Sequence, residues 1–204
     1  MVVDDGSPDG TAREAERAGA VVLKHPVNKG KGVALATAFQ YATEHDFECV
    51  ITMDGDGQHD PADIPAFLEA YGKFSWPVIL GNRMCDTRHM PPVRRWTNRF
   101  MSWLLSRQMA QTIPDTQCGY RLYKCSILPG RGVDAERFAA ESEILMVLAE
   151  SGATMGSIPI RVIYRDEKSK IRPMRDTWRF FQMLVRHRKG CAANRRAMPD
   201  PVRR

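Results

Sequence analysis

The chain has 204 residues, of which 43% are hydrophobic and 26% are charged. This composition excludes an intrinsically disordered protein, and the length suits one domain with a substantial core. The net charge of +6 is uneven, because residues 161–204 hold 14 Lys and Arg against 4 Asp and Glu, whereas residues 1–160 are net acidic. Phosphate-rich partners are therefore expected at the carboxyl-terminal end.

The cysteines and the hydropathy argue against three further classes. None of the five cysteines belongs to a Cys-x-x-Cys pair, which disfavours a zinc site and a disulfide scaffold and indicates a reducing compartment. No 18 apolar residues run together and no signal segment opens the chain, so neither a membrane span nor a secretion signal is predicted.

Predicted strands and helices alternate in the first part of the chain. A strand end at residues 1–3 is followed by strands at 20–24, 49–53 and 77–81. Helices are predicted at 12–18 with Thr11 as N-cap, from the Gly-rich loop 28–32 through residue 43, and at 60–71. The alternation is typical of an α/β fold with a mostly parallel, doubly wound sheet, which binds ligands at the carboxyl ends of its strands.

The second part is predicted to add a long helix at 92–111 and a loop at 115–123 that leads into a strand. A helix at 141–151 and a strand at 155–165 follow, then a helix at 176–188 and a frayed end at 190–204. The helix at 92–111 and the segment 178–186 both mix aromatic and basic residues, a pattern that can lie on an anionic membrane surface. A helix packed on its own sheet is the alternative for the first of them.

Two carboxylates follow the predicted strand at 49–53. Asp54 and Asp56 are two residues apart, a spacing that places both on the same side of an extended backbone. Mg²⁺ and Mn²⁺ prefer such oxygen ligands, and Mg²⁺ is often held by one or two carboxylates plus substrate phosphates. An EF-hand is excluded, because its twelfth position would be Pro65 rather than Glu. The pattern predicts a divalent-metal site that carries a diphosphate.

Five motifs in order now point to a family. They are VDDGSPDGT at 3–11, NKGKG at 28–32, MDGDGQH at 53–59, GNR at 81–83 and DTQCGYR at 115–121. The chain resembles a family 2 glycosyltransferase of GT-A fold, in the branch of dolichol-phosphate mannosyltransferases and polyprenyl-phosphate glycosyltransferases. The resemblance covers residues 1–190 as a catalytic domain and leaves 191–204 as a disordered basic tail. It also implies that the usual first strand and helix of the Rossmann-like sheet are lacking, which would leave an unpaired strand edge.

The resemblance implies roles for particular residues. It assigns Mg²⁺ or Mn²⁺ to Asp54, Asp56 and Gln58, and the nucleotide-sugar to Asp4, Asp5, Asp54 and Arg83. It places Asp115 and Arg121 at the reacting end, and Ser169 and Lys170 at the acceptor phosphate.

Several of these positions have a plainer interpretation. The segment 4–10 could instead be a solvated turn, and the loop 28–32 a structural turn. Asp115 and Arg121 could form a salt bridge with each other, and residues 164–171 could be a solvated charge run.

The implied activity is the inverting transfer of a hexose from a nucleotide-diphosphate sugar, of GDP-mannose or UDP-glucose type, to a polyprenyl or dolichyl phosphate. The alternative is a truncated, catalytically inactive remnant that binds nucleotide or metal. The expected location is the cytoplasmic, inner face of a membrane, at the lipid surface or on a membrane-anchoring partner. No nucleic-acid-binding motif is found, so no nucleic-acid partner is expected.

Overall fold

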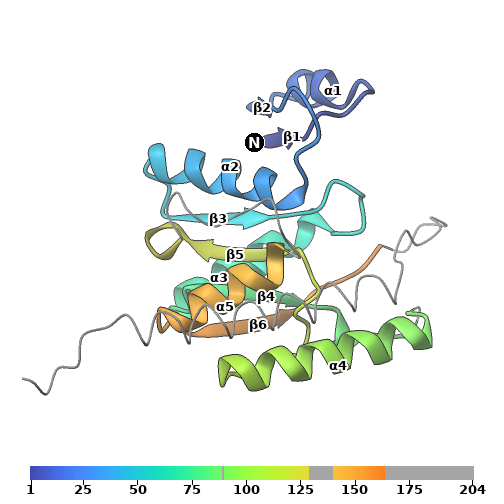
Figure 1. The fold of residues 1–204 in the computed structure, drawn as a ribbon, viewed down its shortest axis with the longest axis vertical. Coiled ribbons are helices and arrows are strands. Elements are labelled where there is room, and N and C mark those ends of the chain that lie inside the picture. The colour runs from blue at the N-terminus through green and yellow to red at the C-terminus, as the bar shows by residue number, and fades with distance from the viewer. Residues whose placement is uncertain (89, 129–139, 164–204) are drawn as a thin grey trace, which may run out of the picture. The chain divides into compact units, whose positions relative to one another are not determined.

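The computed structural model describes residues 1–88, 90–128 and 140–163, and Figure 1 shows their arrangement. The strands are β1 (Val2–Asp4), β2 (Val22–Lys24), β3 (Cys49–Thr52), β4 (Val78–Asn82), β5 (Arg121–Lys124) and β6 (Met155–Pro159). The helices are α1 (Thr11–Arg17), α2 (Lys31–Glu44), α3 (Ile64–Phe74), α4 (Pro92–Met109) and α5 (Ala140–Glu150). The predicted α/β class is confirmed. The helix expected at 176–188, the basic tail, Ser169 and Lys170 lie outside the described residues.

The strands form two sheets rather than one. β1 and β2 pair in parallel, and the second sheet has the order β3-β5-β4-β6. β5 runs antiparallel to both of its neighbours, whereas β4 and β6 are parallel, so the second sheet is mixed. Within the described ranges, one edge of β1 and one edge of β3 carry no strand partner.

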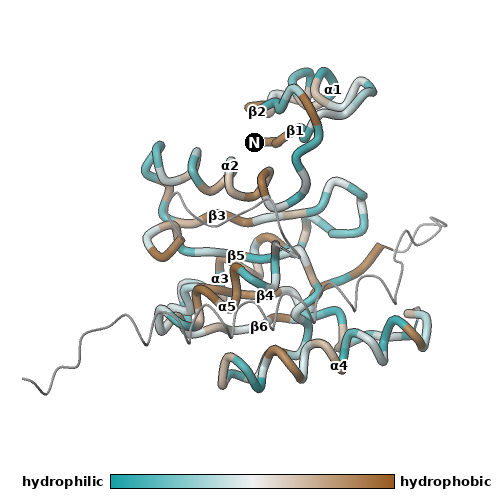
Figure 2. The backbone as a smooth tube through the Cα atoms, in the orientation of Figure 1, coloured by the Kyte–Doolittle hydropathy of each residue, from teal (hydrophilic) through white to brown (hydrophobic). Residues whose placement is uncertain are grey.

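The core lies on the second sheet. Val78, Ile79 and Leu80 of β4 are completely buried, because β4 has a strand on each side. On one face, Phe67 of α3 packs in a cluster with side chains from β4, β5 and β6, namely Ile79, Leu122 and Ile158. Figure 2 shows brown, hydrophobic residues on α5, whereas α4 alternates between brown and teal.

The opposite face of the second sheet meets α2 and α5. Successive residues of a strand point to opposite faces, so Arg121 and Tyr123 of β5 lie on the face away from Leu122. The Tyr123 ring packs edge-on against Phe39 of α2, with centroids 5.2 Å apart. Arg121 reaches the start of α5, where it bonds Glu141. Among the described helices, none is long and apolar enough to cross a bilayer.

Three local expectations differ from the structure. Thr11 is the first residue of α1 rather than its N-cap, and its N–H is accepted by the Asp9 carboxylate. The strand predicted at 155–165 ends at Pro159, after which Val162 forms an isolated bridge with His59. β5 begins at Arg121, inside the expected loop at 115–123. For the two strands, the partner that decides the boundary lies far away in the chain.

Candidate functional site

The loop after β3 carries the two predicted metal-binding aspartates. Asp54 is partly buried, Asp56 is exposed, and both follow the carboxyl end of the strand. Asp54 donates its backbone N–H to His59 Nδ1 at 3.2 Å, and Gln58 donates its backbone N–H to Asp56 Oδ1 at 3.0 Å. Gly57 has a φ of +71°, a conformation that glycine adopts without strain. The two carboxylates therefore lie on one ordered turn.

His59 anchors this turn to the core. Burial lowers its pKa, although the carboxylates of Asp54 and Asp56 partly oppose the shift, so the neutral ring is favoured. A neutral imidazole can accept the Asp54 N–H, and the ring stacks on Tyr120 with centroids 5.0 Å apart. On the other side, Ile163 donates its N–H to Gln58 O at 3.0 Å. The segment that follows β6 therefore runs along the aspartate loop.

Lys31 brings a positive charge to the same place. Its Nζ lies 2.5 Å from Asp54 Oδ1 and also forms an ion pair with Glu141. Burial opposes the charge of Lys31, but the carboxylates of Glu141 and Asp54 outweigh it and raise its pKa. Glu141 continues the chain of charges, because its Oε2 lies 3.4 Å from Arg121. A lysine from the start of α2 thus links the aspartate loop to the start of α5.

Gly119 leaves the space in which these carboxylates meet. A Cβ at this position would lie 2.8 Å from Asp54 Oδ2 and 2.9 Å from Glu141 Oε1. Its carbonyl accepts the Thr52 hydroxyl at 2.9 Å, which ties the end of β3 to the segment before β5. Glycine suits this position because the two acids occupy the space that a Cβ would need.

The donor atoms of this loop suit a hard divalent cation. Asp54 and Asp56 supply carboxylate oxygens and Gln58 an amide oxygen, which are the ligand types that Mg²⁺ and Mn²⁺ prefer. No group of three or more His, Cys, Asp or Glu able to hold a metal is found in the described part of the chain. A cation held here would need further oxygens from a ligand, which agrees with a site that takes the metal together with a diphosphate.

Asp115 pairs with Arg83 rather than with Arg121. The guanidinium is bidentate, with Nε 2.8 Å from Asp115 Oδ2 and Nη2 2.9 Å from Oδ1, and Asn98 also donates to Oδ1 at 2.9 Å. Both side chains are almost completely buried. Burial alone would raise the pKa of Asp115, but its bonds to Arg83 hold that pKa below the usual range. The salt bridge weighed between Asp115 and Arg121 is not the pairing that forms.

Arg121 has no exposed surface. Its guanidinium donates to the carbonyls of Cys118, Thr116 and Glu141, at 2.6, 2.8 and 2.9 Å, and to the Tyr123 hydroxyl at 3.2 Å. These bonds tie the segment before β5 to the start of α5. A guanidinium enclosed in this way orders the loop that holds Gly119.

The two acids after β1 differ in their surroundings. Asp5 accepts the backbone N–H groups of Lys29 at 3.0 Å and Gly30 at 2.7 Å, and it pairs with His25 at 2.7 Å. It therefore holds the Gly-rich loop that leads into Lys31. Asp4 is buried and accepts the Ser7 N–H through Oδ1, whereas its Oδ2 is buried without a hydrogen-bond partner among the described residues. Buried carboxylate oxygens ordinarily accept a hydrogen bond, so this atom is an exception among the described polar groups.

The structure thus places the predicted residues in separate groups rather than in one cluster. It joins Asp54 to Lys31 and Glu141, and it joins Arg83 to Asp115 in a separate buried pair. Sequence reasoning missed Lys31, Glu141 and Gly119, which it treated as parts of a turn, a helix and a loop. Only Lys31 could have been found from the sequence. It lies in a Gly-rich loop at the start of a predicted helix, and helix N-termini bind phosphate through their backbone N–H groups.

The chain is similar to a known protein family and to several named proteins. The family model described as glycosyl transferase family 2 matches residues 1–130. Among named relatives, a UDP-N-acetylglucosamine–dolichyl-phosphate N-acetylglucosaminyltransferase from Methanococcus voltae is 27% identical over 188 residues, covering 81% of this chain and 75% of that protein. An undecaprenyl-phosphate mannosyltransferase from Micrococcus luteus is 27% identical over 180 residues, covering 81% and 72%.

A solved structure shares the fold. It is the glucosyl-3-phosphoglycerate synthase from Mycobacterium tuberculosis in complex with Mn²⁺, uridine diphosphate and glucosyl-3-phosphoglycerate, with a TM-score of 0.63 at 17% identity. The match covers 98% of this chain and 69% of that chain. In another complex of the same synthase, the chain spans 61% of the solved molecule. At this identity the likeness establishes the fold alone.

Proposed function

The chain belongs to glycosyl transferase family 2, and we propose that it transfers a hexose from a nucleotide-diphosphate sugar to a polyprenyl phosphate with inversion. Two observations on relatives support the substrate classes, because the named relatives use dolichyl and undecaprenyl phosphates as acceptors by their descriptions. The observation that carries the proposal is the cluster of Asp54, Lys31 and Glu141 beside Asp56 at the carboxyl end of β3.

In the proposed reaction an acceptor phosphate oxygen attacks the anomeric carbon as the bond from that carbon to the diphosphate breaks. The nucleotide diphosphate leaves with the bonding electron pair. We assign Mg²⁺ or Mn²⁺ to Asp54, Asp56 and Gln58, and when bound it supplies Lewis-acid neutralisation of the leaving diphosphate. The solved Mn²⁺ and uridine diphosphate complex of the fold relative supports a divalent metal.

The remaining residues are proposed to position the substrates. Lys31, which pairs with Asp54, would bind a diphosphate oxygen, for which its compact charge is suited. Asp4 would accept a donor group of the nucleoside through its unpartnered Oδ2. Asp5 would act through the loop that carries Lys31.

Asp115 would stand near the acceptor, with Arg83 and Arg121 as the groups that hold the surrounding loops. Ser169 and Lys170 would meet the acceptor phosphate. We place the reaction at the cytoplasmic face of a membrane, with this chain as a peripheral protein.

The experiment measures transfer of labelled sugar from GDP-mannose, UDP-glucose or UDP-N-acetylglucosamine to a short-chain polyprenyl phosphate, with Mn²⁺, Mg²⁺ or a chelator. Asp56→Asn should lower metal-dependent transfer by at least about 100-fold, because a lost metal ligand removes several kcal/mol of transition-state stabilisation. Asp46→Asn is the matched control, since Asp46 is exposed, lies away from the cluster and has a φ of 54° that Asn tolerates.

Retained metal-dependent transfer in Asp56→Asn would sink the assignment of the aspartates. Metal or nucleotide binding without turnover by any donor would instead support the inactive remnant.

A further inference from the structure

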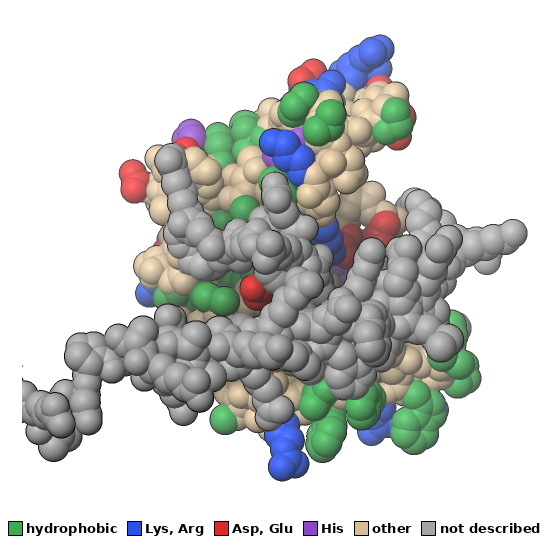
Figure 3. Space-filling view, in the orientation of Figure 1, with side chains coloured by type: hydrophobic (Ala, Val, Ile, Leu, Met, Phe, Trp, Pro, Cys, Tyr) green, Lys and Arg blue, Asp and Glu red, His purple; other side chains and the backbone are tan. Residues whose placement is uncertain are grey.

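The segment that follows β6 forms a short ladder with the aspartate loop that follows β3. Val162 makes an antiparallel bridge with His59, and next to it Ile163 donates its N–H to the Gln58 carbonyl at 3.0 Å. The loop belongs to the charged end of β3, where Figure 3 shows red and blue side chains close together. So few paired residues do not hold two segments together in water, because even a complete two-stranded hairpin is marginally stable. Further contacts are therefore needed to keep this segment on the loop.

Asp63 supplies such a contact. Its Oδ2 accepts the backbone N–H of Arg161 at 2.8 Å, and its Oδ1 lies 3.3 Å from Arg161 Nε. Only 8% of Asp63 is exposed. A hydrogen bond to a carboxylate is stronger than one between neutral groups, and burial strengthens it further. Asp63 thus binds the backbone two residues before the N–H that Gln58 accepts.

The carboxylate of Asp63 is not used by its own helix. Asp63 is the N-cap of α3, a position at which an Asp side chain commonly accepts an N–H of the first turn, yet it makes no such bond. The preceding turn, Pro61–Asp63, is capped by Asp60, whose Oδ1 accepts the Ala62 N–H at 2.9 Å. Both oxygens of Asp63 are instead bonded to Arg161, 98 positions away in the chain.

The backbone of Arg161, rather than its guanidinium, carries this contact. The side chain of Arg161 is 67% exposed, with Nη2 3.7 Å from Asp60 Oδ2. Ion pairs of such exposed groups contribute little to stability. The N–H bond is shorter and ends on the buried carboxylate of Asp63. A change of the Arg161 side chain should therefore leave the contact in place, whereas loss of the Asp63 carboxylate removes it.

We propose that Asp63 is a positioning residue for the cation site. By holding Arg161, it keeps the N–H of Ile163 on the Gln58 carbonyl. Gln58 in turn donates its own N–H to Asp56 Oδ1 at 3.0 Å. The turn that presents Asp56 and Gln58 thus depends on an acid that is itself engaged with Arg161. This inference rests on the proposed function, in which Asp56 and Gln58 hold Mg²⁺ or Mn²⁺.

The test titrates Mn²⁺ into the full chain without donor, followed by electron paramagnetic resonance, and measures hydrogen exchange of the Ile163 amide by NMR. Asp63→Ala should weaken Mn²⁺ binding about tenfold or more, because loss of the contacts behind metal ligands commonly costs about 10- to 100-fold in affinity. The Ile163 amide should exchange at least about tenfold faster, because the segment opens locally. Arg161→Gln should stay within about twofold of wild type in both measurements.

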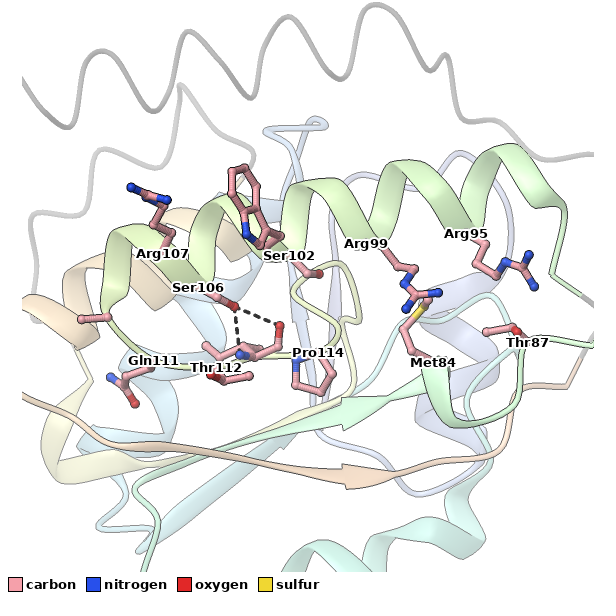
Figure 4. Close-up of a pocket in the computed structure, with 13 residues that line it drawn as sticks. Met84, Thr87, Arg95, Arg99, Ser102, Ser106, Arg107, Gln111, Thr112 and Pro114 are labelled. Carbon is pink, nitrogen blue, oxygen red and sulfur yellow. Dashed lines mark hydrogen bonds between the residues drawn. The ribbon is translucent and has the colours of Figure 1, made fainter.

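Two further variants separate position from stability. Asp63→Asn keeps an oxygen for the Arg161 N–H, so its effects should fall between those of Asp63→Ala and Arg161→Gln. Ser106→Ala removes a comparable contact elsewhere, since the Ser106 hydroxyl accepts the Ile113 N–H at 2.9 Å and donates to its carbonyl at 3.1 Å, as the dashed lines in Figure 4 show. Ser106 lines a hollow of about 590 Å³ beside α4, and no described residue of the aspartate loop borders it. Ser106→Ala should lower the thermal unfolding midpoint and leave Mn²⁺ binding and Ile163 exchange unchanged.

Equal Mn²⁺ affinity of wild type and Asp63→Ala would overturn the proposal, as would unchanged exchange of Ile163. A loss of affinity in Ser106→Ala as large as in Asp63→Ala would also overturn it, because the effect would then come from general stability. If Asp63→Ala does not fold, Asp63→Asn decides, and equality with Arg161→Gln refutes the positioning role.

The proposed function is tested separately by sugar transfer. Weakened Mn²⁺ binding in Asp63→Ala, without transfer by the wild type, refutes only the function. Transfer by the wild type, with equal Mn²⁺ affinity in Asp63→Ala, refutes only the positioning role.

Discussion

Gly119 determines how closely the charges of the candidate site approach each other. Asp54 comes from the loop after β3, Glu141 from the start of α5, and both carboxylates lie against the glycine α-carbon. A Cβ here would lie less than 3.0 Å from a carboxylate oxygen of each acid, so the two side chains would have to shift. The atoms displaced are the ends of side chains, so the fold can survive a change that the site cannot.

Gly119→Ala is therefore expected to lower kcat/KM for sugar transfer by about 10- to 100-fold, since misplacing reacting groups by about 1 Å costs this much. The thermal unfolding midpoint should change little. Gly72→Ala serves for comparison, because a Cβ at that exposed position of α3 meets nothing within 4 Å. Full activity in Gly119→Ala would show that the Asp54 and Glu141 positions do not matter.

The pair of Arg83 and Asp115 is the most buried ion pair in the described residues. Asp115→Asn leaves the Arg83 charge without its partner, and breaking a buried pair in this way costs about 3–5 kcal/mol of unfolding free energy. Asp86→Asn breaks the exposed pair with Arg88 and should have no measurable effect. Urea unfolding of both variants checks the contrast. Equal stability of the two would mean that burial does not decide the strength of the pair.

The same pair predicts a dependence on pH. The pKa of Asp115 is lower in the folded chain than the ordinary value of about 3.9. The contribution of Asp115 to the free energy of unfolding is therefore complete at pH values above about 3.9. The contribution is lost as the pH falls through the lowered pKa. The stability difference between wild type and Asp115→Asn should therefore be constant from about pH 5 to 8 and narrow below about pH 4. A difference that varies between pH 6 and 8 would contradict this origin.

At the scale of elements, the Gly-rich loop is held in place by one side chain. Asp5, which follows β1, accepts two backbone N–H groups just before α2. These bonds fix the position at which α2 begins. Within the loop at 28–32, the N–H groups of Lys29 and Gly30 are therefore occupied by the Asp5 carboxylate. Lys31 follows this segment directly, so the bonds to Asp5 also affect the position of Lys31.

Asp5→Asn should loosen this turn. We expect the amides of Lys29 and Gly30 to exchange with solvent about tenfold faster, because hydrogen bonds to a charged acceptor contribute about 1.5–3 kcal/mol. Hydrogen exchange measured by NMR resolves both amides. Glu16→Gln on the exposed side of α1 is the control, and unchanged exchange at Lys29 and Gly30 would show that the loop does not depend on Asp5.

α4 shows why element prediction stops short of function. The bounds of α4 were predicted to within two residues. The spacing of its apolar residues, however, does not decide between a helix packed on its sheet and a helix on a membrane. Both of its sides carry apolar residues. Only the packing shows that Met101 and Leu105 face the core while Trp96 and Trp103 remain exposed.

At the scale of the whole molecule, the two sheets differ in how well they are covered. β4 lies between two strands, and its residues from Val78 to Gly81 are buried. In β1, Val2 and Val3 stay partly exposed, and among the described residues β1 has a strand on one side only. Local stability follows such burial, because regions with few buried contacts open at lower free energy.

Hydrogen exchange followed by mass spectrometry should therefore protect Val78–Asn82 most strongly. Val2–Asp4 and Val22–Lys24 should exchange at least about tenfold faster, because each 1.4 kcal/mol of local stability corresponds to a factor of ten. Equal protection of both sheets would show that they unfold as a single unit.

The sequence by itself determined the α/β class, the order of strands and helices, and the placement of Asp54 and Asp56 after a strand, because these depend on local periodicity, turns and caps. Only the tertiary structure decided which charges meet. Lys31 pairs with Asp54 and Glu141, Asp115 pairs with Arg83, and Arg121 is enclosed by carbonyls. Such contacts join residues far apart in the chain, and they depend on strand register and helix packing, which no local spacing specifies.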